Sequence, residues 1–543
     1  MSAADVVLTG GRVWTADPAA PWAEAAAVAG GRLTAVGSRS EVAALTGPAT
    51  RVIRLPAGHL VVPGLIDAHT HYLDGPSEAA GVDLSNADTL DEVVRILEAA
   101  DRSVPVVTGG GWRSHIFPDG PDRRLLDGIF GDVPVMLREI NSHSLWVNSA
   151  ALRIAGVTAV TPDPEPGFSE FARDRHGEPT GWVLEMAAMD RVRDAVSPPR
   201  PEQVRAELLA AQEGYAAAGL TSAFDAGVFT IGEHAGWDLL GDLDREGRLG
   251  QRVVGSKAAN SDPEDAVAIL AEARQQARSP NVRIDTLKVF VDGVPEAHTA
   301  AYLEPYADRP DTAGPLAAPE EDIRRWAIEA GGAGLNCHFH AIGDRAVRVA
   351  LDAVEAARER SAPGVVFTIC HGDLIDPTDL PRFAGLGVVW NTSGQWIAST
   401  PVDAVMARRL GERARHHYRL RSALDLGVTV TLGSDFAASA YVSTYRPLVL
   451  VESAVTRRLA GVTVGDPLPP ASEAIGVAEA LRAMTSAAAA QLGIAGRTGS
   501  LTPGKDADLV VLGADLFEIP AHRIAATPVV LTMRAGRITH EAR

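Results

Sequence analysis

The chain of 543 residues contains only two cysteines, Cys337 and Cys370. Two cysteines exclude a fold held together by several disulfides, and they are typical of a reducing compartment. The N-terminal stretch MSAADVVLTGGRVW has no basic segment followed by an apolar one, so we expect no signal peptide. No apolar run approaches the roughly 20 residues of a membrane-spanning helix. We therefore expect a cytoplasmic protein that does not associate with a membrane.

Positive charge is also scarce. The chain has 50 Lys plus Arg against 69 Asp plus Glu, which gives a net charge of −19. The acidic residues are spread along the chain, which excludes the basic face that nucleic acid or an anionic membrane would need. A content of 46% hydrophobic and 22% charged residues is typical of a globular protein. At this length we expect two or more structural units, and a homodimer is the commonest assembly if there is one.

Lysine is rarer still, and its three positions are Lys257, Lys288 and Lys505. Lys288 lies in RIDTLKVFVDGV (283–294), where β-branched and apolar residues predict a buried strand. An unpaired ammonium is costly there, and lysine, unlike arginine, readily gives up its proton when buried and then acts as an amine. We interpret Lys288 as a functional residue. The alternative is a lysine whose stem packs in the core while its amine pairs with Asp285 or Asp292.

Both ends of the chain predict β-structure. Residues 5–16 and 25–37 alternate apolar and polar residues around Gly-Gly turns, and residues 506–516 and 529–542 alternate in the same way. Each end is short for an independent sheet. We therefore predict one small β-sandwich domain built from both termini, with residues 1–58 and 488–543 as its two parts.

The body of the chain, residues 59–487, alternates short apolar stretches with alanine-rich amphipathic ones. Repeated strand–helix units imply a parallel sheet, and eight such units fit a closed (β/α)8 barrel of the TIM type. A long segment at about 75–200, rich in turn residues, interrupts the series after the first strand and predicts an inserted cap. The eight expected strands lie at 59–71, 219–227, 251–258, 286–293, 334–343, 365–373, 386–394 and 428–436.

Polar residues follow the expected strands at the end where barrel active sites occur. His69 and His71 are two apart, so an extended strand turns both to one face. His340, His371 and Asp435 end later strands. Each signal alone has another explanation: a lone HxH is weak, a single buried histidine can be hydrogen-bonded in a core, and Gly-Ser-Asp can cap a helix. Together the five predict a metal centre.

Lys288 fits this arrangement. A lysine amine buried in the barrel can react with carbon dioxide to give a carbamate, which is a carboxylate-like bridge between two divalent metals. The reaction replaces a costly buried cation by an anion that the metals stabilise.

Long stretches of the chain resemble the amidohydrolase superfamily, and within it the branch of YtcJ-like proteins and N-substituted formamide deformylase. The resemblance covers nearly the whole chain, including the cap, and the order of PGLIDAHTH and HAIGDRA is its most specific feature. It rests on VVPGLIDAHTH, LKVFVDGVPEAHTAAYLEPY, CHFHAIGDRAVRVALDAVE, TICHGDLIDPTDLPRFAGLGV, VTVTLGSDF, GSLTPGKDADLVVL and, in the cap, GGGW and PVMLREINSHSLWVNSAAL.

The resemblance implies one or two divalent ions, most often zinc, although iron and manganese suit the same ligands. His69, His71 and Asp435 would bind the more buried metal, His340 and His371 the second, and Lys288 as a carbamate would bridge them. The implied chemistry is attack of a metal-activated water on a carbonyl or amidine-like carbon of a small molecule. Asp435 would take up the proton and pass it to the leaving amine.

Two departures from the family pattern concern the substrate: WNTSGQWIAST (390–400) and Arg113-Ser114 after GGGW. Both regions are expected to line the pocket. The predicted substrate-binding residues are Trp112, His143, His338 and Trp396, with packing as the alternative for the two tryptophans. Cys337 and Cys370 each precede a predicted ligand, so strand alternation is expected to turn them away from the metals, as small buried hydrophobic residues.

Three functions remain open from the sequence. The first is a metal-dependent hydrolase that cleaves an amide-type C–N bond, with an N-acyl or N-formyl amine as substrate. The second is a deaminase or a cyclic-imide or amidine hydrolase of the same superfamily, which would release ammonia or a ring-opened acid. The third is a non-catalytic metal-binding scaffold, which the complete set of six ligand-type residues disfavours.

Overall fold

The computed structural model describes residues 3–276 and 279–542, and its centre is a barrel of eight parallel strands. The barrel with its separate terminal sheet confirms the predicted fold class, and all eight strands fall on the expected stretches. In the order in which they pair they are β6 (Leu65–Thr70), β13 (Leu220–Asp225), β14 (Arg252–Ala258), β15 (Val282–Phe290), β16 (Asn336–Ala341), β17 (Phe367–His371), β18 (Val389–Ser393) and β19 (Thr429–Gly433).

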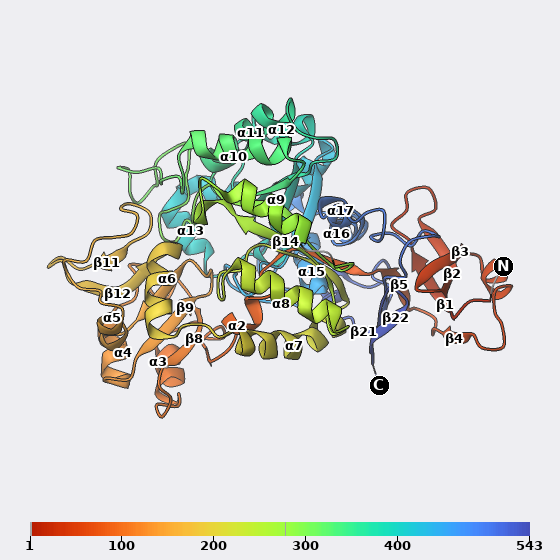
Figure 1. Cartoon of the computed structure of the whole chain (residues 1–543), viewed down its shortest axis with the longest axis horizontal. Helices are drawn as coiled ribbons and strands as arrows, with labels where there is room; N and C mark the ends of the chain where they lie inside the picture. The colour runs from red at the N-terminus through yellow and green to blue at the C-terminus, as the bar shows by residue number, and fades with distance from the viewer. Residues whose placement is uncertain (1–2, 277–278, 543) are drawn as a thin grey trace.

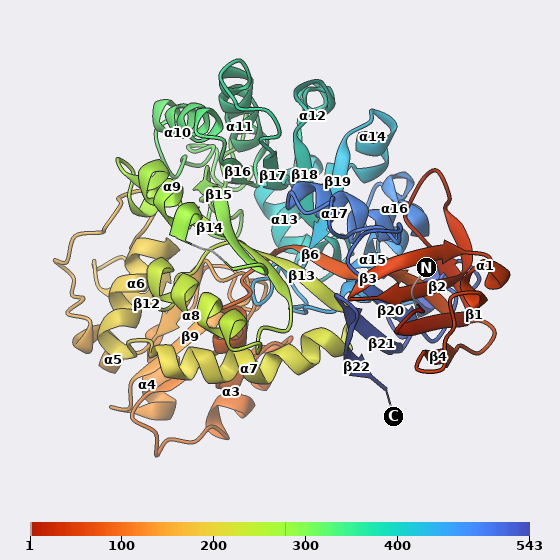
Figure 2. The ribbon, with the colours of Figure 1, turned by 45° about the vertical axis from the view of Figure 1, so that its right-hand side comes forward.

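Helices follow the strands and cover the outside of the barrel (Figures 1 and 2). Strand alternation divides the side chains: in β15, Leu287 and Val289 join the apolar core under the helices, while Lys288 between them lies in the barrel mouth cavity. The covering helices are α7 (Pro201–Ala217), α8 (Glu233–Arg245), α9 (Ala266–Gln276), α10 (Glu320–Gly332), α11 (Asp344–Arg358), α12 (Leu380–Leu386), α14 (Leu420–Asp425), α15 (Pro447–Thr456), α16 (Val477–Ala483) and α17 (Ser486–Gln491). The helix α13 (Asp403–Leu410) instead lines a cavity at the barrel mouth.

The barrel closes where β19 meets β6. The backbone N–H of Asp435 donates to the carbonyl of His69 at 2.7 Å. A side chain at Gly433 would collide with the backbone of His69, since a Cβ placed there would lie 2.6 Å from its nitrogen and 2.7 Å from its oxygen. Glycine at this position therefore lets the last strand approach the first, and Asp435 follows two residues later.

Strands from both termini form one sheet beside the barrel, which Figure 1 shows in red and blue. β1 bends at Gly10 (φ +110°), so its first half pairs with β4 and its second half with β5. The two halves share one apolar core with Leu8, Val61, Leu509 and Leu531. The strands are β1 (Val6–Trp14), β2 (Trp22–Ala29), β3 (Arg32–Gly37), β4 (Arg51–Arg54), β5 (Leu60–Pro63), β20 (Leu509–Leu512), β21 (Val529–Arg534) and β22 (Arg537–Glu541), with α1 (Arg39–Ala43) between β3 and β4.

The sandwich expected from the termini is thus a single bent sheet. β5 pairs with β1 and β20 in this sheet, and the chain enters the barrel at β6 after Gly64. The domain limits at 58–59 and 487–488 stay predictions.

A third unit lies between β6 and α7, where the cap was expected. Its six-stranded sheet has helices on both faces, because Trp146 packs with α3 and α4 while Leu145 and Val147 pack with α5 and α6. Its elements are α2 (Gly75–Glu78), β7 (Val82–Asp83), α3 (Leu90–Glu98), β8 (Val107–Trp112), α4 (Arg123–Phe130), β9 (Val135–Glu139), β10 (Ser144–Val147), α5 (Ser149–Ile154), β11 (Phe171–Arg173), β12 (Pro179–Leu184) and α6 (Glu185–Val196). Across residues 3–276 and 279–542, none of the helices combines the length and apolarity that crossing a membrane requires.

A buried ion-pair network joins the barrel to the terminal sheet. Arg252, at the start of β14, is 2% exposed and donates to Asp508 at 2.9 Å and to Asp506 at 3.0 Å. Breaking such a buried pair leaves charged groups uncompensated.

Replacing Arg252 by Ala should therefore lower the free energy of unfolding by about 3–5 kcal/mol. The matched control is Arg153→Ala, which removes a pair with Asp132 between two exposed side chains and should cost at most about 1 kcal/mol. Denaturant titration of both variants measures the difference. Equal losses in the two variants would contradict the role given to Arg252.

Candidate metal centre and active site

Two histidines from the first strand meet one carboxylate from the last at the barrel mouth. His69 Nε2 lies 3.2 Å and His71 Nε2 3.4 Å from Asp435 Oδ1. One ligand atom from each of the three lies within 4.8 Å of the others. The expected common face of the two histidines is therefore present, and barrel closure supplies the carboxylate.

The charges in this group are strongly coupled. Burial opposes the charged form of Asp435, but the neighbouring His69, His71 and His371 outweigh it and hold its pKa well below the usual range. Burial and the charge of Lys288 lower the pKa of His69 to about 4. For His71, the hydrogen bond and charge of Asp435 overcome burial and raise the pKa to about 9. Asp435 is thus a carboxylate, and His69 is the neutral imidazole that ligates metals.

His340 and His371 lie beside this group. Their ring centroids are 4.4 Å apart, and His371 Nδ1 is 4.0 Å from Asp435 Oδ2. Among the described residues, His371 Nδ1 has no hydrogen-bond partner although it is buried. Burial lowers the pKa of both histidines well below the ordinary value, so both are neutral. A buried neutral imidazole nitrogen without a partner is a free ligand atom.

Lys288 is 1% exposed, and its amine lies in the same cavity. Its Nζ is 3.6 Å from Cys370 Sγ and 5.1 Å from the centroid of the Phe290 ring. The alternative partners are engaged elsewhere: Asp285 pairs with Arg283, and Asp292 accepts backbone N–H groups of Ala301, Ile342 and Gly343. Within the described ranges, no carboxylate pairs with this amine, which removes the packing alternative.

The expected orientation of Cys370 is wrong. Its sulfur lies against Lys288, and it groups with His69 and His338 within 4.8 Å, so it faces the barrel interior. Alternation fails because His371 leaves the extended conformation, with φ at +70°. Burial raises the pKa of Cys370 to about 12, so its sulfur is a thiol. Cys337 packs in the apolar core outside the barrel, as expected.

These residues fit a divalent metal. Imidazole nitrogens and a carboxylate are the donors that zinc prefers, and His71, with its pKa raised to about 9, would release a proton when a metal binds. The free His371 Nδ1 and the amine of Lys288 without a carboxylate are buried polar groups that a metal and a carbamate would satisfy. His69, His71 and Asp435 form one half of the centre, and His340 and His371 the other. Lys288 lines the same cavity as both halves.

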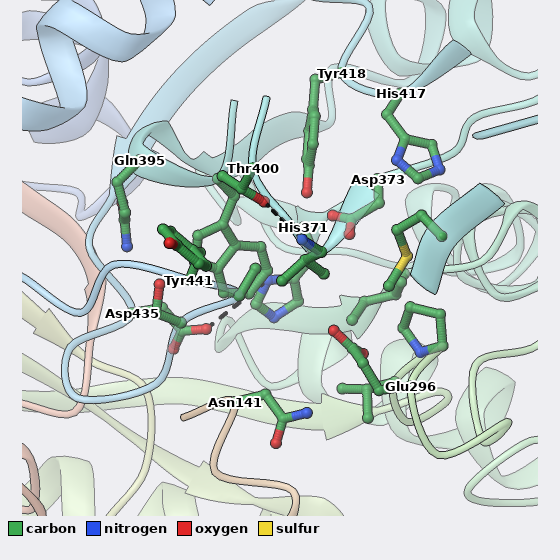
Figure 3. A pocket seen from close by; sticks show the side chains of 18 of the residues that line it. Asn141, Glu296, His371, Asp373, Gln395, Thr400, His417, Tyr418, Asp435 and Tyr441 are labelled. Carbon is green, nitrogen blue, oxygen red and sulfur yellow. Dashed lines mark hydrogen bonds and ion pairs between the residues drawn. The ribbon is translucent and has the colours of Figure 1, made fainter. Parts of the chain in front are cut away.

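Two adjoining cavities open from the centre. The inner one, of about 460 Å³, is lined by all six ligand-type residues and by Phe229, Phe290 and residues of the cap. The outer one, of about 730 Å³, shares His143, His340, His371 and Asp435 with it. Figure 3 shows this outer cavity, with Asp435 and Gln395 on one side and Asp373, His417 and Glu296 on the other.

His143 reaches the centre from the cap. Its ring centroid is 5.3 Å from that of His340, and its Nδ1 is 2.7 Å from Glu185 Oε2. Glu185 is 1% exposed and also accepts the hydroxyl of Thr299 at 2.6 Å. Burial works against the charged imidazole, but the charge and hydrogen bond of Glu185 raise the pKa of His143 above the ordinary value. The structure thus places His143, as predicted, on the wall of both cavities.

Of the other three predicted pocket residues, only one lines a cavity. Trp396 lines the outer cavity and stacks on His371, with ring centroids 5.2 Å apart and planes 8° apart. Trp112 and His338 do not line either cavity, so the expectation for them is corrected. Trp112 is 1% exposed in the cap core and donates to the carbonyl of Leu137 at 3.1 Å. His338 lies two residues before His340 in β16, on the same face of the strand but deeper in the barrel. Its Nε2 is 2.8 Å from His69 Nδ1 and orients the His69 ring.

The two departures from the family pattern act differently. Gln395, Trp396 and Thr400 line the outer cavity, as expected for this segment. Arg113 lies behind the wall: its guanidinium carbon is 3.9 Å from the Tyr441 ring centroid, and it donates to the Tyr441 carbonyl at 3.0 Å. Arg113 therefore positions a wall residue and does not itself line the cavity.

The sequence did not identify several of the residues that line the outer cavity. Asp373 stands two residues after His371 in CHGD, so its position offered a signal. The others lie in loops or after helices without a strand-end pattern, and only the tertiary fold brings them to the mouth: Asn141, Glu296, His417, Tyr418 and Tyr441.

The carboxyl group of Asp225, also at the barrel mouth, differs from that of Asp435 because its pKa is raised. Asp225, the last residue of β13, is 1% exposed and neither carboxyl oxygen has a hydrogen-bond partner in the described part of the chain. Burial, and then the charge of Asp74, raise its pKa to about 8. The folded protein therefore keeps a proton on Asp225 that the unfolded chain releases near pH 4, and this part of the stability is lost as pH rises towards 8.

Asp225→Asn removes this proton uptake. Relative to the wild type, the variant should gain up to about 1.4 kcal/mol of unfolding free energy per pH unit between about pH 5 and 8. Denaturant titrations at three pH values, at constant metal content, measure this slope. Asp132→Asn, at an exposed carboxylate, is the control and should follow the wild type. A variant that keeps the wild-type slope would contradict the assignment.

The sequence matches a known family along most of its length. Residues 57–540 match a family model described as Amidohydrolase family. Over 546 residues the chain is 28% identical to the protein YtcJ of Bacillus subtilis (strain 168), with 98% of each chain covered. Over 563 residues it is 30% identical to N-substituted formamide deformylase of Arthrobacter pascens, with 99% of this chain and 98% of that one covered. The resemblance found in the sequence is confirmed.

The fold has solved counterparts. An uncharacterized metal-dependent hydrolase from Pyrococcus horikoshii OT3 superposes with a TM-score of 0.72 at 22% identity, covering 95% of this chain and 99% of that one. A second uncharacterized metal-dependent hydrolase, from Pyrococcus furiosus, gives a TM-score of 0.69 at 26% identity.

Proposed function

Because the chain belongs to the amidohydrolase family, we propose that it is a metal-dependent hydrolase that cleaves an amide-type C–N bond of a small molecule. The observation that carries the proposal is the meeting of His69, His71 and His371 on the carboxylate of Asp435, at the base of a cavity. The named relative N-substituted formamide deformylase supports an N-acyl or N-formyl amine as substrate.

We propose that His69, His71 and Asp435 hold one divalent ion, and His340 and His371 a second, with Lys288 as a carbamate between them; zinc suits the donors best. Bound there, the ions would supply Lewis-acid activation of water and of the scissile carbonyl. The residues themselves account for the proton movements and for the orientation of the substrate.

Asp435 is placed to move protons. Its two oxygens face different partners, since Oδ1 lies near His69 and His71 while Oδ2 is directed towards His371 and the outer cavity. A carboxylate at this point accepts a proton from the attacking water and donates it to the nitrogen of the leaving amine. We therefore assign Asp435 as the catalytic base and acid.

His143 is placed to act on the carbonyl oxygen. With Nδ1 held by Glu185, the ring presents Nε2 to the cavity that His340 and Asp435 also line. A donor fixed in this way stabilises negative charge that develops on an oxygen in the transition state. Trp396, stacked on His371, forms part of the wall of the outer cavity.

The remaining expectations belong to the same proposal. A cytoplasmic protein agrees with two buried free cysteines, and a small-molecule substrate agrees with a cavity at the barrel mouth that the ligand-type residues line. A homodimer, and the absence of nucleic-acid and membrane partners, stay predictions.

Metal removal and a substrate screen test the function. Dialysis against a chelator should remove about one or two equivalents of a transition metal together with all activity, and added zinc should restore both. The screen compares N-formyl and N-acyl amines with cyclic imides, amino-heterocycles and dipeptides. Release of an amine and a carboxylate supports the proposal, whereas ammonia or a ring-opened acid as the sole product assigns the alternative chemistry. Asp435→Asn, which should lose about a thousandfold or more in kcat, controls for contaminating hydrolases.

Lys288→Ala tests the carbamate separately. The variant should lose bound metal and about a hundredfold or more in activity, because one bridging ligand is missing. A short carboxylic acid, which fits the space left by the side chain, should restore part of both. Lys257→Ala is not a suitable control, since Lys257 is buried in ion pairs with Glu233 and Asp262; the exposed Arg153→Ala variant serves instead. Full metal content and activity in Lys288→Ala would remove the bridge from the proposal.

A further inference from the structure

The outer cavity has a second polar end, away from Asp435. Asp373, from the loop after β17, and Glu296, from the loop after β15, both line it, and each is 8% exposed. Figure 3 shows their carboxyl groups on the side of the cavity opposite Asp435 and Gln395. Both residues line the same cavity, and both are buried.

Neither carboxyl group has a cationic partner among the described residues. Over residues 3–276 and 279–542, no ion pair joins a lysine, arginine or histidine to Asp373 or Glu296, and Asp373 Oδ1 is buried without a hydrogen-bond partner. The nearby Arg409 is directed elsewhere: it pairs with Asp308 and donates to the backbone carbonyl of Glu296 at 2.9 Å. Two buried carboxyls facing an open cavity are costly unless something in the cavity compensates them.

The wall around this end is built to stay in place. Arg457, 0% exposed, donates to the backbone carbonyls of Leu468 at 2.8 Å, Tyr418 at 2.9 Å and His417 at 3.1 Å. The backbone N–H of Tyr418 in turn donates to the Asp373 carbonyl at 3.0 Å. His417 adds a buried ring nitrogen, Nε2, that has no hydrogen-bond partner in the part of the chain that the structure describes. The acceptors at this end are therefore held in fixed positions.

Apolar side chains line the same cavity. Its wall also carries Val294, Val402, Met406 and Leu468. A ligand that fills the cavity thus meets the metal-ligand residues, hydrocarbon and the carboxyl groups of Asp373 and Glu296.

We propose that Asp373 and Glu296 form a subsite for a cationic nitrogen, an ammonium or guanidinium group, and that the substrate is an N-acyl amine carrying such a second, positively charged nitrogen. A bound cation would donate a hydrogen bond to Asp373 Oδ1, which lacks a partner among the described residues. The subsite stands on its own residues, whereas the identity of the bond cleaved rests on the proposed function.

Binding tests the subsite without hydrolysis. N-butylguanidinium, which is charged at every accessible pH and is a poor metal ligand, is titrated calorimetrically into the metal-loaded protein. Asp373→Asn and Glu296→Gln should each weaken its binding about ten- to hundredfold. The matched control is Asp376→Asn, three residues further along the same loop, whose carboxylate pairs with Arg348 and Thr378 and which should bind as the wild type does. No binding to the wild type, or unchanged binding in both subsite variants, overturns the inference.

Kinetics then separate the two proposals. N-acetyl-1,5-diaminopentane and N-acetylhexylamine differ in one terminal group, an ammonium in the first and a methyl in the second. The wild type should prefer the ammonium compound by about ten- to hundredfold in kcat/KM, and this preference should fall in both subsite variants. Equal kcat/KM values for the two compounds would overturn the proposed subsite but not the proposed hydrolase function. Guanidinium binding without hydrolysis of either compound overturns the proposed function and leaves the subsite. The comparison of the two compounds is made on the wild type. It therefore tests the subsite even if the Asp373→Asn variant folds poorly.

Discussion

The first and last strands of the barrel approach so closely that no side chain fits between them at Gly433. This approach brings the carboxylate of Asp435 against His69 and His71, whose nitrogens lie 3.2 and 3.4 Å from it. The carboxylate keeps its charge in a buried place because imidazoles surround it, and the imidazoles keep their orientation because the carboxylate and His338 hold them. Every role proposed for the cavity starts from this contact, since the chemistry occurs where these groups meet.

The cap and the loops add what the barrel strands lack. From the cap, His143 reaches the centre with its orientation set by the buried Glu185. From the loops come Asp373, Glu296 and the segment held by Arg457. The barrel therefore determines the type of chemistry, while the loops and the cap determine which molecule fits, as is usual for this architecture. The acidic far end of the cavity gives this chain a selectivity that the ligand-type residues alone do not define.

Two lysines buried in the protein, Lys288 and Lys257, differ in their ion-pair partners. Lys288 is a buried amine without a carboxylate, next to neutral histidines, and it suits conversion to an anion. By contrast Lys257, equally buried, has Glu233 and Asp262 as partners within 2.9 Å. This difference in partners supports a structural role for Lys257 and the proposed reactive role for Lys288.

Much of this architecture was readable in the sequence, because strand alternation and strand ends are local properties. Short apolar stretches between alanine-rich amphipathic ones located all eight barrel strands. Residues at the ends of these strands pointed to His69, His71, His340, His371 and Asp435, and Lys288 stood out inside the fourth. Local patterns failed where the backbone departs from regular geometry, as at His371, whose positive φ turns Cys370 inward. They also failed for Trp112, because packing of the cap decides which face of a strand is buried. The tertiary structure alone decided that Asp373, Glu296 and His417, far apart in the chain, share one wall, since no local pattern records which loops meet above a closed barrel.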